Sequence, residues 1–231
     1  MRWDMPSRFA LVPRDGRSGD VRWFEAAPTF VEHWLNAYEE GDEVILDGYF
    51  QEDPLPTPPE NYPPEVAPMF GIIDGAKIRP RLHRWRFNLA NGTTREEDLG
   101  PYRTDIEFGT FNQHYAGRKY RYAYSATLEP GMFLFNGWVK HDLQTGKSWE
   151  FPLAPGRYAS ESPFAPRIGA VDEDDGYLVS FVIDQNRGTS ECVVLDAKRI
   201  EDGPVVRIAL PHKLSSGTHS CWAGREVLGT H

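Results

Sequence analysis

Short apolar runs that recur between clusters of Gly, Asp, Asn and Pro are the main feature of this sequence. The runs are rich in Val, Ile, Phe, Tyr and Trp, and helical periodicity is hard to find, which is typical of β-strands. The pattern predicts strands at residues 42–50, 77–89, 121–128, 132–143, 148–153, 176–184 and 190–197. We therefore expect an all-β protein.

The turns between these runs carry their own signals. In "EEGDE", "LQTGKS" and "DEDDGY", glycine stands where a left-handed backbone would reverse the chain. The acidic run at residues 172–175 is interpreted as a solvated hairpin turn, because adjacent carboxylates repel one another and a calcium loop needs alternating ligands. Residues 49–70 hold seven prolines, so we expect a surface loop or lid there rather than regular structure.

Repeated antiparallel hairpins with glycine-marked turns are compatible with a β-sandwich or a β-propeller. The chain has 231 residues, of which 40% are hydrophobic, enough for one large domain or two small ones. Because a propeller blade has about four strands, a chain of this length would supply only part of a typical ring.

Charge and cysteine content exclude several classes of protein. The formal net charge is −9 and no basic stripe is present, so we expect no nucleic-acid binding. The two cysteines, Cys192 and Cys221, form no CxxC motif, and a reduced cytoplasmic protein is the simplest interpretation. We find no secretory signal and no apolar stretch of about 18 residues. The protein is thus expected to be soluble, with peripheral membrane contact left open.

The candidate chemistry begins with the histidines, whose spacing matches no local metal-binding motif. His33 stands in the alternating run "TFVEHWLNAYEE", where both a structural histidine and a metal ligand are compatible with the pattern. There is no GxSxG motif, and neither cysteine has a basic neighbour, so acyl transfer is not supported. The seven histidines are His33, His83, His114, His141, His212, His219 and His231.

Eight sequence blocks, spread over nearly the whole chain, resemble the carotenoid cleavage oxygenases, a family that includes lignostilbene dioxygenases and the retinal pigment epithelium isomerohydrolase. The resemblance implies a seven-bladed β-propeller with a non-haem Fe(II) on its axis, held by four histidines, three of them braced by glutamates. In chain order the blocks are "SRFALVPRDG", "VRWFE", "TFVEHWLNAYEEGDEVILD", "DIEFGTFNQHYAGRKYRYAY", "GWVKHDLQTGKSWEF", "SESPFAPRIGAVDEDDGYLVSFVID", "SECVVLDA" and "LPHKLSSGTHSCW".

The resemblance implies roles for four residues. His33 in "VEHWLNAYE" matches the third iron ligand, and His219 in "GTHSCW" matches the fourth. Glu107 in "DIEFGTFN" and Glu161 in "SESPF" match two of the bracing glutamates. A carboxylate that accepts the second N–H of a metal-bound imidazole orients the ring, and four neutral imidazoles leave two positions of an octahedral iron open. The other five histidines are expected to be surface or structural residues.

The chain departs from the family pattern at three positions. Glu32, Gly109 and Ser220 stand where the family usually has an aromatic residue, a proline and a glycine. The first two histidines and the remaining glutamate have no counterpart. The resemblance therefore implies that residues 1–231 form the C-terminal portion of a carotenoid oxygenase domain, a partial propeller without the N-terminal blades.

The implied reaction is cleavage by O₂ of a conjugated C=C bond in a carotenoid, apocarotenoid or stilbenoid, which yields two carbonyl products. The expected partners are O₂, an apolar conjugated alkene and a separate N-terminal half. The alternatives are a catalytically inactive propeller fragment that lacks two iron ligands, half of a split enzyme, and a propeller hydrolase that uses carboxylates. The hydrolase is disfavoured because the best-placed glutamates coincide with the bracing motif.

Overall fold

The computed structural model describes residues 2–51, 79–100, 105–215 and 217–229. The regular structure in these ranges is almost entirely β-strand, which confirms the predicted all-β class. The chain divides into two compact units, here called unit 1 (Met1–Thr104 and Gly117–Lys119) and unit 2 (Asp105–Ala116 and Tyr120–His231). The proline-rich segment lies outside the described residues from residue 52 onward, as does His231.

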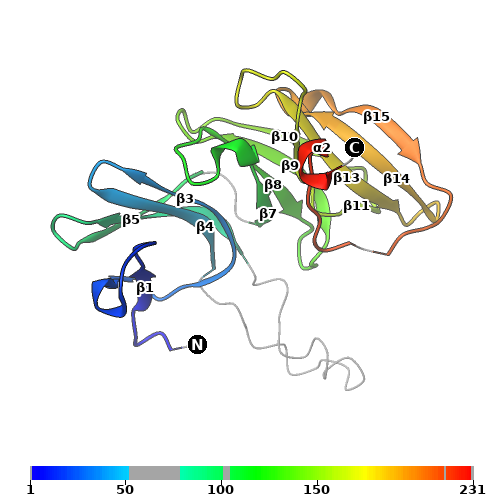
Figure 1. Cartoon of the computed structure of the whole chain (residues 1–231). Helices are drawn as coiled ribbons and strands as arrows, with labels where there is room; N and C mark the ends of the chain where they lie inside the picture. Colours follow the sequence, from blue (N-terminus) through cyan, green and yellow to red (C-terminus); the bar gives the residue numbers. More distant parts are fainter. Residues whose placement is uncertain (1, 52–78, 101–104, 216, 230–231) are drawn as a thin grey trace, which may run out of the picture. The chain divides into compact units, whose positions relative to one another are not determined.

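Unit 1 contains a two-stranded hairpin, β1-β2, and a four-stranded antiparallel sheet in the order β3-β4-β5-β6 (Figure 1). A 3-10 turn, η1 (Ser18–Asp20), connects the two strands of the hairpin. The strands are β1 (Ser7–Leu11), β2 (Arg22–Ala26), β3 (Phe30–Glu40), β4 (Glu43–Gln51), β5 (Arg81–Asn88) and β6 (Thr94–Asp98).

An aromatic core and a buried ion pair hold unit 1 together. The ring of Phe87 packs on those of Phe9 and Phe24, at centroid distances of 5.0 and 5.2 Å. Asp47 and Arg84 lie opposite each other on β4 and β5 and form a bidentate pair with N···O distances of 2.7 and 2.8 Å. Because both side chains are buried, loss of either would leave an uncompensated charge.

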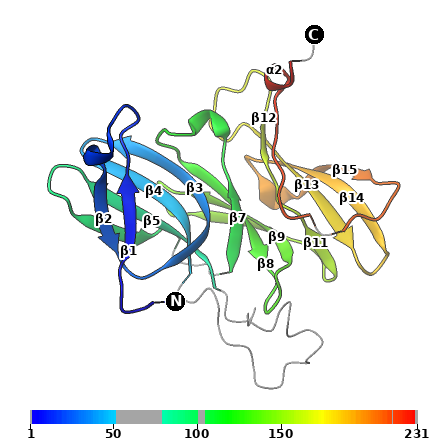
Figure 2. The ribbon, with the colours of Figure 1, turned by 60° about the horizontal axis from the view of Figure 1, so that its bottom comes forward.

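Unit 2 contains a nine-stranded sheet with the main order β15-β14-β13-β11-β9-β8-β7 (Figure 2). In addition, β10 pairs with β9 and β12 pairs with β13. No helix among the residues described is long and apolar enough to cross a membrane. The elements are β7 (Ile106–Thr110), η3 (Gln113–Tyr115), β8 (Tyr122–Leu128), β9 (Phe135–Asp142), β10 (Ser148–Pro152), β11 (Arg157–Ala159), β12 (Phe164–Pro166), β13 (Gly176–Asp184), β14 (Thr189–Asp196), η4 (Ile200–Asp202), β15 (Pro204–Ala209) and α2 (Arg225–Leu228).

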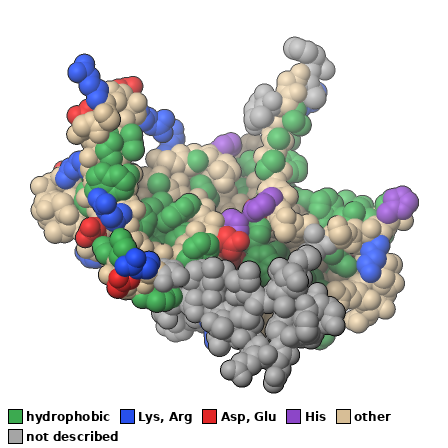
Figure 3. Space-filling model, turned by 90° about the horizontal axis from the view of Figure 1, so that it is seen from below, with side chains coloured by type: hydrophobic (Ala, Val, Ile, Leu, Met, Phe, Trp, Pro, Cys, Tyr) green, Lys and Arg blue, Asp and Glu red, His purple; other side chains and the backbone are tan. Residues whose placement is uncertain are grey.

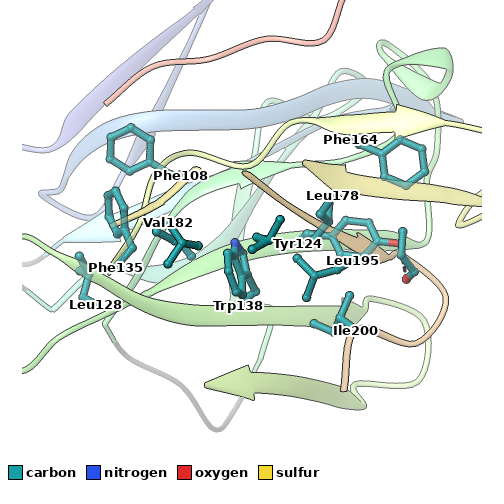
Figure 4. Close-up of a cluster of buried hydrophobic side chains, with 14 residues drawn as sticks. Phe108, Tyr124, Leu128, Phe135, Trp138, Phe164, Leu178, Val182, Leu195 and Ile200 are labelled. Atoms are coloured by element: carbon teal, nitrogen blue, oxygen red, sulfur yellow. Dashed lines mark hydrogen bonds between the residues drawn. The ribbon is translucent and has the colours of Figure 1, made fainter. Parts of the chain in front are cut away.

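The core of unit 2 is centred on Trp138, with Phe108 and Phe135 at one end of the cluster and Phe164 at the other (Figure 4). Its polar atoms have partners, as buried Trp and Tyr require. The indole N–H of Trp138 donates to a serine hydroxyl at 2.6 Å, and the hydroxyl of Tyr124 donates to a backbone carbonyl at 3.0 Å.

The seven predicted strands correspond to β4, β5, β8, β9, β10, β13 and β14. The turn glycines Gly41 and Gly146 have the expected left-handed backbone, with φ of 60° and 72°. For Gly176 that reason is wrong, because it lacks a positive φ. A Cβ there would lie 2.5 Å from the ring of Phe164 and 2.7 Å from the carbonyl of Ala165, so close packing requires the glycine.

The interpretation of the acidic run 172–175 as solvated is correct for Asp172, whose side chain is 67% exposed, but wrong for the half-buried residues 173–175. The run does lie in the β12–β13 hairpin connection, but each carboxylate has a partner within unit 2. Glu173 accepts two backbone N–H bonds from the start of β8, both at 2.7 Å, and burial raises its pKa. The other three form the ion pairs Asp172–Lys198, Asp174–Lys140 and Asp175–Arg167.

The end of β9 is held by a carboxylate that serves both a turn and an ion pair. Asp142 is buried and accepts two bonds from the Arg121 guanidinium, at 2.9 and 2.8 Å. It also accepts the hydroxyl of Thr145 at 2.8 Å within the β9–β10 turn. The bonds from Arg121 outweigh the effect of burial and hold the pKa of Asp142 well below its usual value.

A carboxyl pKa that is lower in the folded state stabilises the fold above the unfolded value of about 3.9, and this contribution disappears as the pH falls through the folded value. We therefore expect Asp142→Asn to lower the free energy of unfolding by about 1–2 kcal/mol at neutral pH, since Arg121 is partly exposed. Below about pH 4 the difference should shrink. Urea unfolding at several pH values would measure the difference in free energy of unfolding between the variant and the unchanged protein. The exposed Asp202→Asn is the control. A difference that does not change with pH would contradict this account.

Candidate functional site

His219 lies in the irregular segment between β15 and α2, and a carboxylate faces one edge of its ring. Its Nδ1 is 3.4 Å from Oε2 of Glu161. The His219 side chain is 67% exposed, whereas that of Glu161 is 19% exposed. A proton held on Nδ1 by the carboxylate keeps the ring lone pair on Nε2, the nitrogen that can then bind a metal.

Glu161 is aimed by the two serines beside it. Ser160 and Ser162 are buried, and each is fixed by a donor from the sheet. The backbone N–H of Phe181 donates to the Ser160 hydroxyl at 3.1 Å, and the indole of Trp138 donates to the Ser162 hydroxyl at 2.6 Å. Since neighbours in an extended segment point to opposite sides, Glu161 is directed away from the core and toward His219.

Ser220 ties the histidine segment to Glu161 at two points. Its backbone N–H donates to Oε2 of Glu161 at 2.5 Å, the same oxygen that faces the imidazole. Its hydroxyl donates to the backbone carbonyl of Glu161 at 3.1 Å. A glycine at this position, the usual family residue, could make only the first bond.

Glu107 is fully buried on β7, at a point where the strand is irregular. Its carboxylate accepts the backbone N–H of Phe108 at 2.7 Å. Phe108 and Gly109 together oppose Ser125 of β8, which makes a β-bulge in the pairing. The ring of Phe108 lies 5.3 Å from that of His219, so Glu107 is one residue from the side chain that packs on the histidine.

His33 lies on β3 of unit 1, also at a break in strand register. Glu32 and His33 together oppose Tyr49 of β4, and a second shift follows between Trp34 and Asn36. A Cβ on Gly48 would lie 2.7 Å from the indole of Trp34, so the glycine leaves room for this side chain. Bulges redirect side chains relative to a regular strand, and these bulges set the direction of the half-buried His33.

The structure therefore brings His219 and Glu161 together and places Phe108 between Glu107 and His219. His33 belongs to unit 1 and the other three predicted residues to unit 2, so the convergence of the two histidines stays a prediction. Sequence reasoning alone missed Phe108 as a neighbour of the site. A phenylalanine in the sequence does not indicate the left-handed backbone that Phe108 has in the structure.

The remaining described histidines have other surroundings. His83 of β5 has Nδ1 2.6 Å from Asp98 and Nε2 3.2 Å from Glu96, so both ring nitrogens face carboxylates, as in a structural ion pair. His141 is buried beside the hydroxyl of Ser125, at 3.3 Å. His114 and His212 are exposed.

The donor set suits the iron that the resemblance implies. Imidazole is a common ligand of iron in proteins, and a histidine whose other nitrogen faces a carboxylate is the usual arrangement around a bound metal. The pair His219–Glu161 has this arrangement within unit 2. The residues present therefore fit a metal centre.

Comparison with known proteins identifies the family. The family model of the retinal pigment epithelial membrane protein matches residues 1–224 of the chain. This chain belongs to the carotenoid cleavage oxygenase family. A carotenoid 9,10(9',10')-cleavage dioxygenase of Crocus sativus is 33% identical over 96% of the chain.

Solved structures of the carotenoid cleavage oxygenases match as well. The lignostilbene dioxygenase of Pseudomonas brassicacearum has a TM-score of 0.79 and 30% identity over 96% of the chain, which covers 47% of that protein. Cobalt-substituted apocarotenoid oxygenase of Synechocystis has a TM-score of 0.79 and 28% identity over 93% of the chain, which covers 43% of that protein. These matches confirm the β-propeller family.

The chain spans 42% of the length of the Crocus enzyme. A partial propeller is consistent with this coverage and with the similar share of the solved structures. The relatives are enzymes, named as dioxygenases that act on carotenoids or lignostilbenes.

The contact between His219 and Glu161 can be tested by metal binding. In the protein that contains this chain, Glu161→Gln should weaken Fe(II) or Co(II) binding by about 10- to 100-fold, because the neutral amide no longer favours the proton on Nδ1. Equilibrium titration of metal-free protein would measure the affinity. Glu201→Gln, on the exposed η4 turn, is the matched control. Equal affinities in the two variants would remove the bracing role.

Proposed function

We propose that the protein containing this chain is a non-haem Fe(II) dioxygenase, which cleaves a conjugated C=C bond of a carotenoid, apocarotenoid or stilbenoid with O₂. The observation that supports this most is the contact between Nδ1 of His219 and the Glu161 carboxylate, since it matches a braced metal ligand. The names of the relatives support the substrate class.

In this proposal His33 and His219 bind the iron through ring nitrogens, and Glu107 and Glu161 brace ligand histidines. When bound, the iron would activate O₂ and orient it toward the substrate. Glu161 holds the proton on Nδ1 of His219, and Ser220 fixes the carboxylate in place. Neutral imidazole ligands would leave the positive charge of a bound metal uncompensated.

The surroundings of His219 suit an apolar conjugated substrate. The buried ring of Phe108 lies beside it and packs on buried Phe135. The partly exposed ring of Phe133 contacts Phe108 and Phe135 at 6.0 and 5.6 Å. An alkene without polar groups offers no hydrogen bonds, so its binding depends on the burial of apolar surface. Aromatic side chains provide that surface.

We further propose that a separate N-terminal half completes the fold and supplies the remaining ligands. The chain spans 42% of a relative, and unit 2 has an open apolar face at its β15 edge. Hydrophobic side chains reach the surface in the space-filling view (Figure 3). On this face Phe181, Val206 and Ile208 are 43%, 45% and 52% exposed, which is suited to cover by a further blade.

The ligand assignment is tested by substitution of each histidine in turn. His33→Ala and His219→Ala should each remove most of the bound iron and all alkene cleavage, whereas His212→Ala, an exposed histidine near the site segment, should change neither. Iron per protein can be measured by elemental analysis, and the aldehyde products of a stilbene or apocarotenoid by chromatography. Full iron occupancy in either site variant would show that the residue is no ligand.

The separate-half proposal is tested by complementation. The 231-residue chain alone should bind iron weakly, show no alkene cleavage and aggregate through its uncovered apolar face. Co-expression with a preceding half that carries two further histidines should restore one iron per protein and turnover. Tight one-to-one iron binding with turnover by the isolated chain would contradict the proposal and show a complete site within it.

A further inference from the structure

Phe108 has a backbone conformation that bulky residues avoid. Its φ is +52°, and that of Asp105 is +74°. Among the residues described, these two are the non-glycine positions with a left-handed backbone. Asp adopts this region with modest cost, but for a phenylalanine it is a genuine outlier. Such strained residues persist only where their surroundings determine them, and they cluster at functional sites.

The surroundings of Phe108 fix this conformation from both sides. Its backbone N–H donates to the Glu107 carboxylate at 2.7 Å, and the carbonyl of Asp105 accepts the backbone N–H of Leu128 at 2.8 Å. On the other side of Phe108, pairing with β8 resumes at Thr110, after the bulge opposite Ser125. The strain is therefore built into the strand around Glu107.

This backbone conformation places the Phe108 ring against His219. The centroids of the two rings are 5.3 Å apart and the ring planes are tilted by 37°, a distance within the range of interacting aromatic pairs. The Phe108 ring also packs edge-to-face on the rings of Phe135 and Phe133, at centroid distances of 4.8 and 6.0 Å. Phe108 and Phe135 lie together at one end of the core (Figure 4). The core thus supports the ring that contacts the histidine.

The Phe108 ring adds to the contacts that hold the His219 side chain. His219 lies between β15 and α2 without regular structure, and its side chain is 67% exposed. The contact between Nδ1 and Glu161 holds one edge of the ring, but rotation about that contact would still move Nε2. The Phe108 ring, packed 5.3 Å from the imidazole, restricts that rotation.

We propose that Phe108 is a positioning residue for His219. The left-handed backbone at Phe108 holds its ring against the imidazole, which fixes the ring plane so that Nε2 is directed at the metal. The inference rests on the proposed function, in which His219 is a metal ligand. A ligand held in place before binding gives tighter metal affinity, because less freedom is lost on binding.

The test uses Phe108→Leu, which keeps apolar volume but removes the flat ring. In the full protein that contains this chain, we expect Co(II) affinity to fall about tenfold and the Co(II) absorption bands to shift, since the ligand geometry changes. In metal-free protein, the ring-proton NMR signals of His219 should also move, because the neighbouring aromatic ring is gone. Phe111→Leu, a buried ring that packs on Tyr120, is the matched control.

A double-mutant comparison separates this inference from the proposed function. In a His219→Ala background, Phe108→Leu should cause no further loss of Co(II) affinity. If His219→Ala leaves the affinity unchanged, the ligand assignment fails and the positioning role fails with it. If His219→Ala lowers the affinity while Phe108→Leu matches Phe111→Leu in affinity and spectrum, the positioning role alone is wrong. Thermal unfolding of each variant confirms that the compared proteins are folded.

Discussion

The carboxylate of Glu161 is the contact on which the described part of the site depends. It faces Nδ1 of His219 and accepts the backbone N–H of Ser220 with the same oxygen, so it joins an irregular segment to a rigid sheet. The sheet in turn fixes Glu161 through buried Ser160 and Ser162. The ring of Phe108 and the bond from the Ser220 hydroxyl to the Glu161 carbonyl are further contacts of this segment.

Two of the predicted site residues, the ligand His33 and the bracing Glu107, stand at interruptions of their strands. A regular strand can aim side chains only to two opposite faces, and an extra residue in one strand changes that direction. His33 lies in such a shift on β3, and Glu107 precedes one on β7. Some ladder hydrogen bonds are lost, but side chains gain directions that a regular sheet does not provide. The fold thus gives up regular pairing at the positions where the site needs other directions.

The sequence predicted seven strands and two turn glycines, because apolar runs and left-handed turns depend on neighbouring residues. The predicted strands did not include β1, β2, β3, β6, β7, β11, β12 and β15, of which β11 and β12 have three residues and are too short to show a period. The sequence was wrong about residues 173–175 because the partners of those carboxylates, such as Lys140 for Asp174, come from distant strands. Local charge repulsion was the only term that the sequence could show.

For the site, the residue types came from the resemblance and the geometry came from long-range contacts. Ser220 and Glu161 are 59 positions apart, and no spacing rule links them. The left-handed backbone of Phe108 has no signal at all in the sequence, since that conformation usually belongs to Gly, Asn or Asp. A motif therefore names the ligands, but the contacts that hold them appear only in the folded chain.

The three departures from the family pattern are understandable in the same terms. At Ser220 the contact to the Glu161 carboxylate comes from the backbone N–H, so a side chain in place of glycine leaves it intact and adds one bond. Gly109 lies within the β7 bulge, where pairing is already interrupted. Glu32 is exposed, and its carboxylate lies within 4.8 Å of a ring nitrogen of His33. None of the three departures removes one of the contacts described for the site. The pair of His219 and Glu161 is therefore preserved.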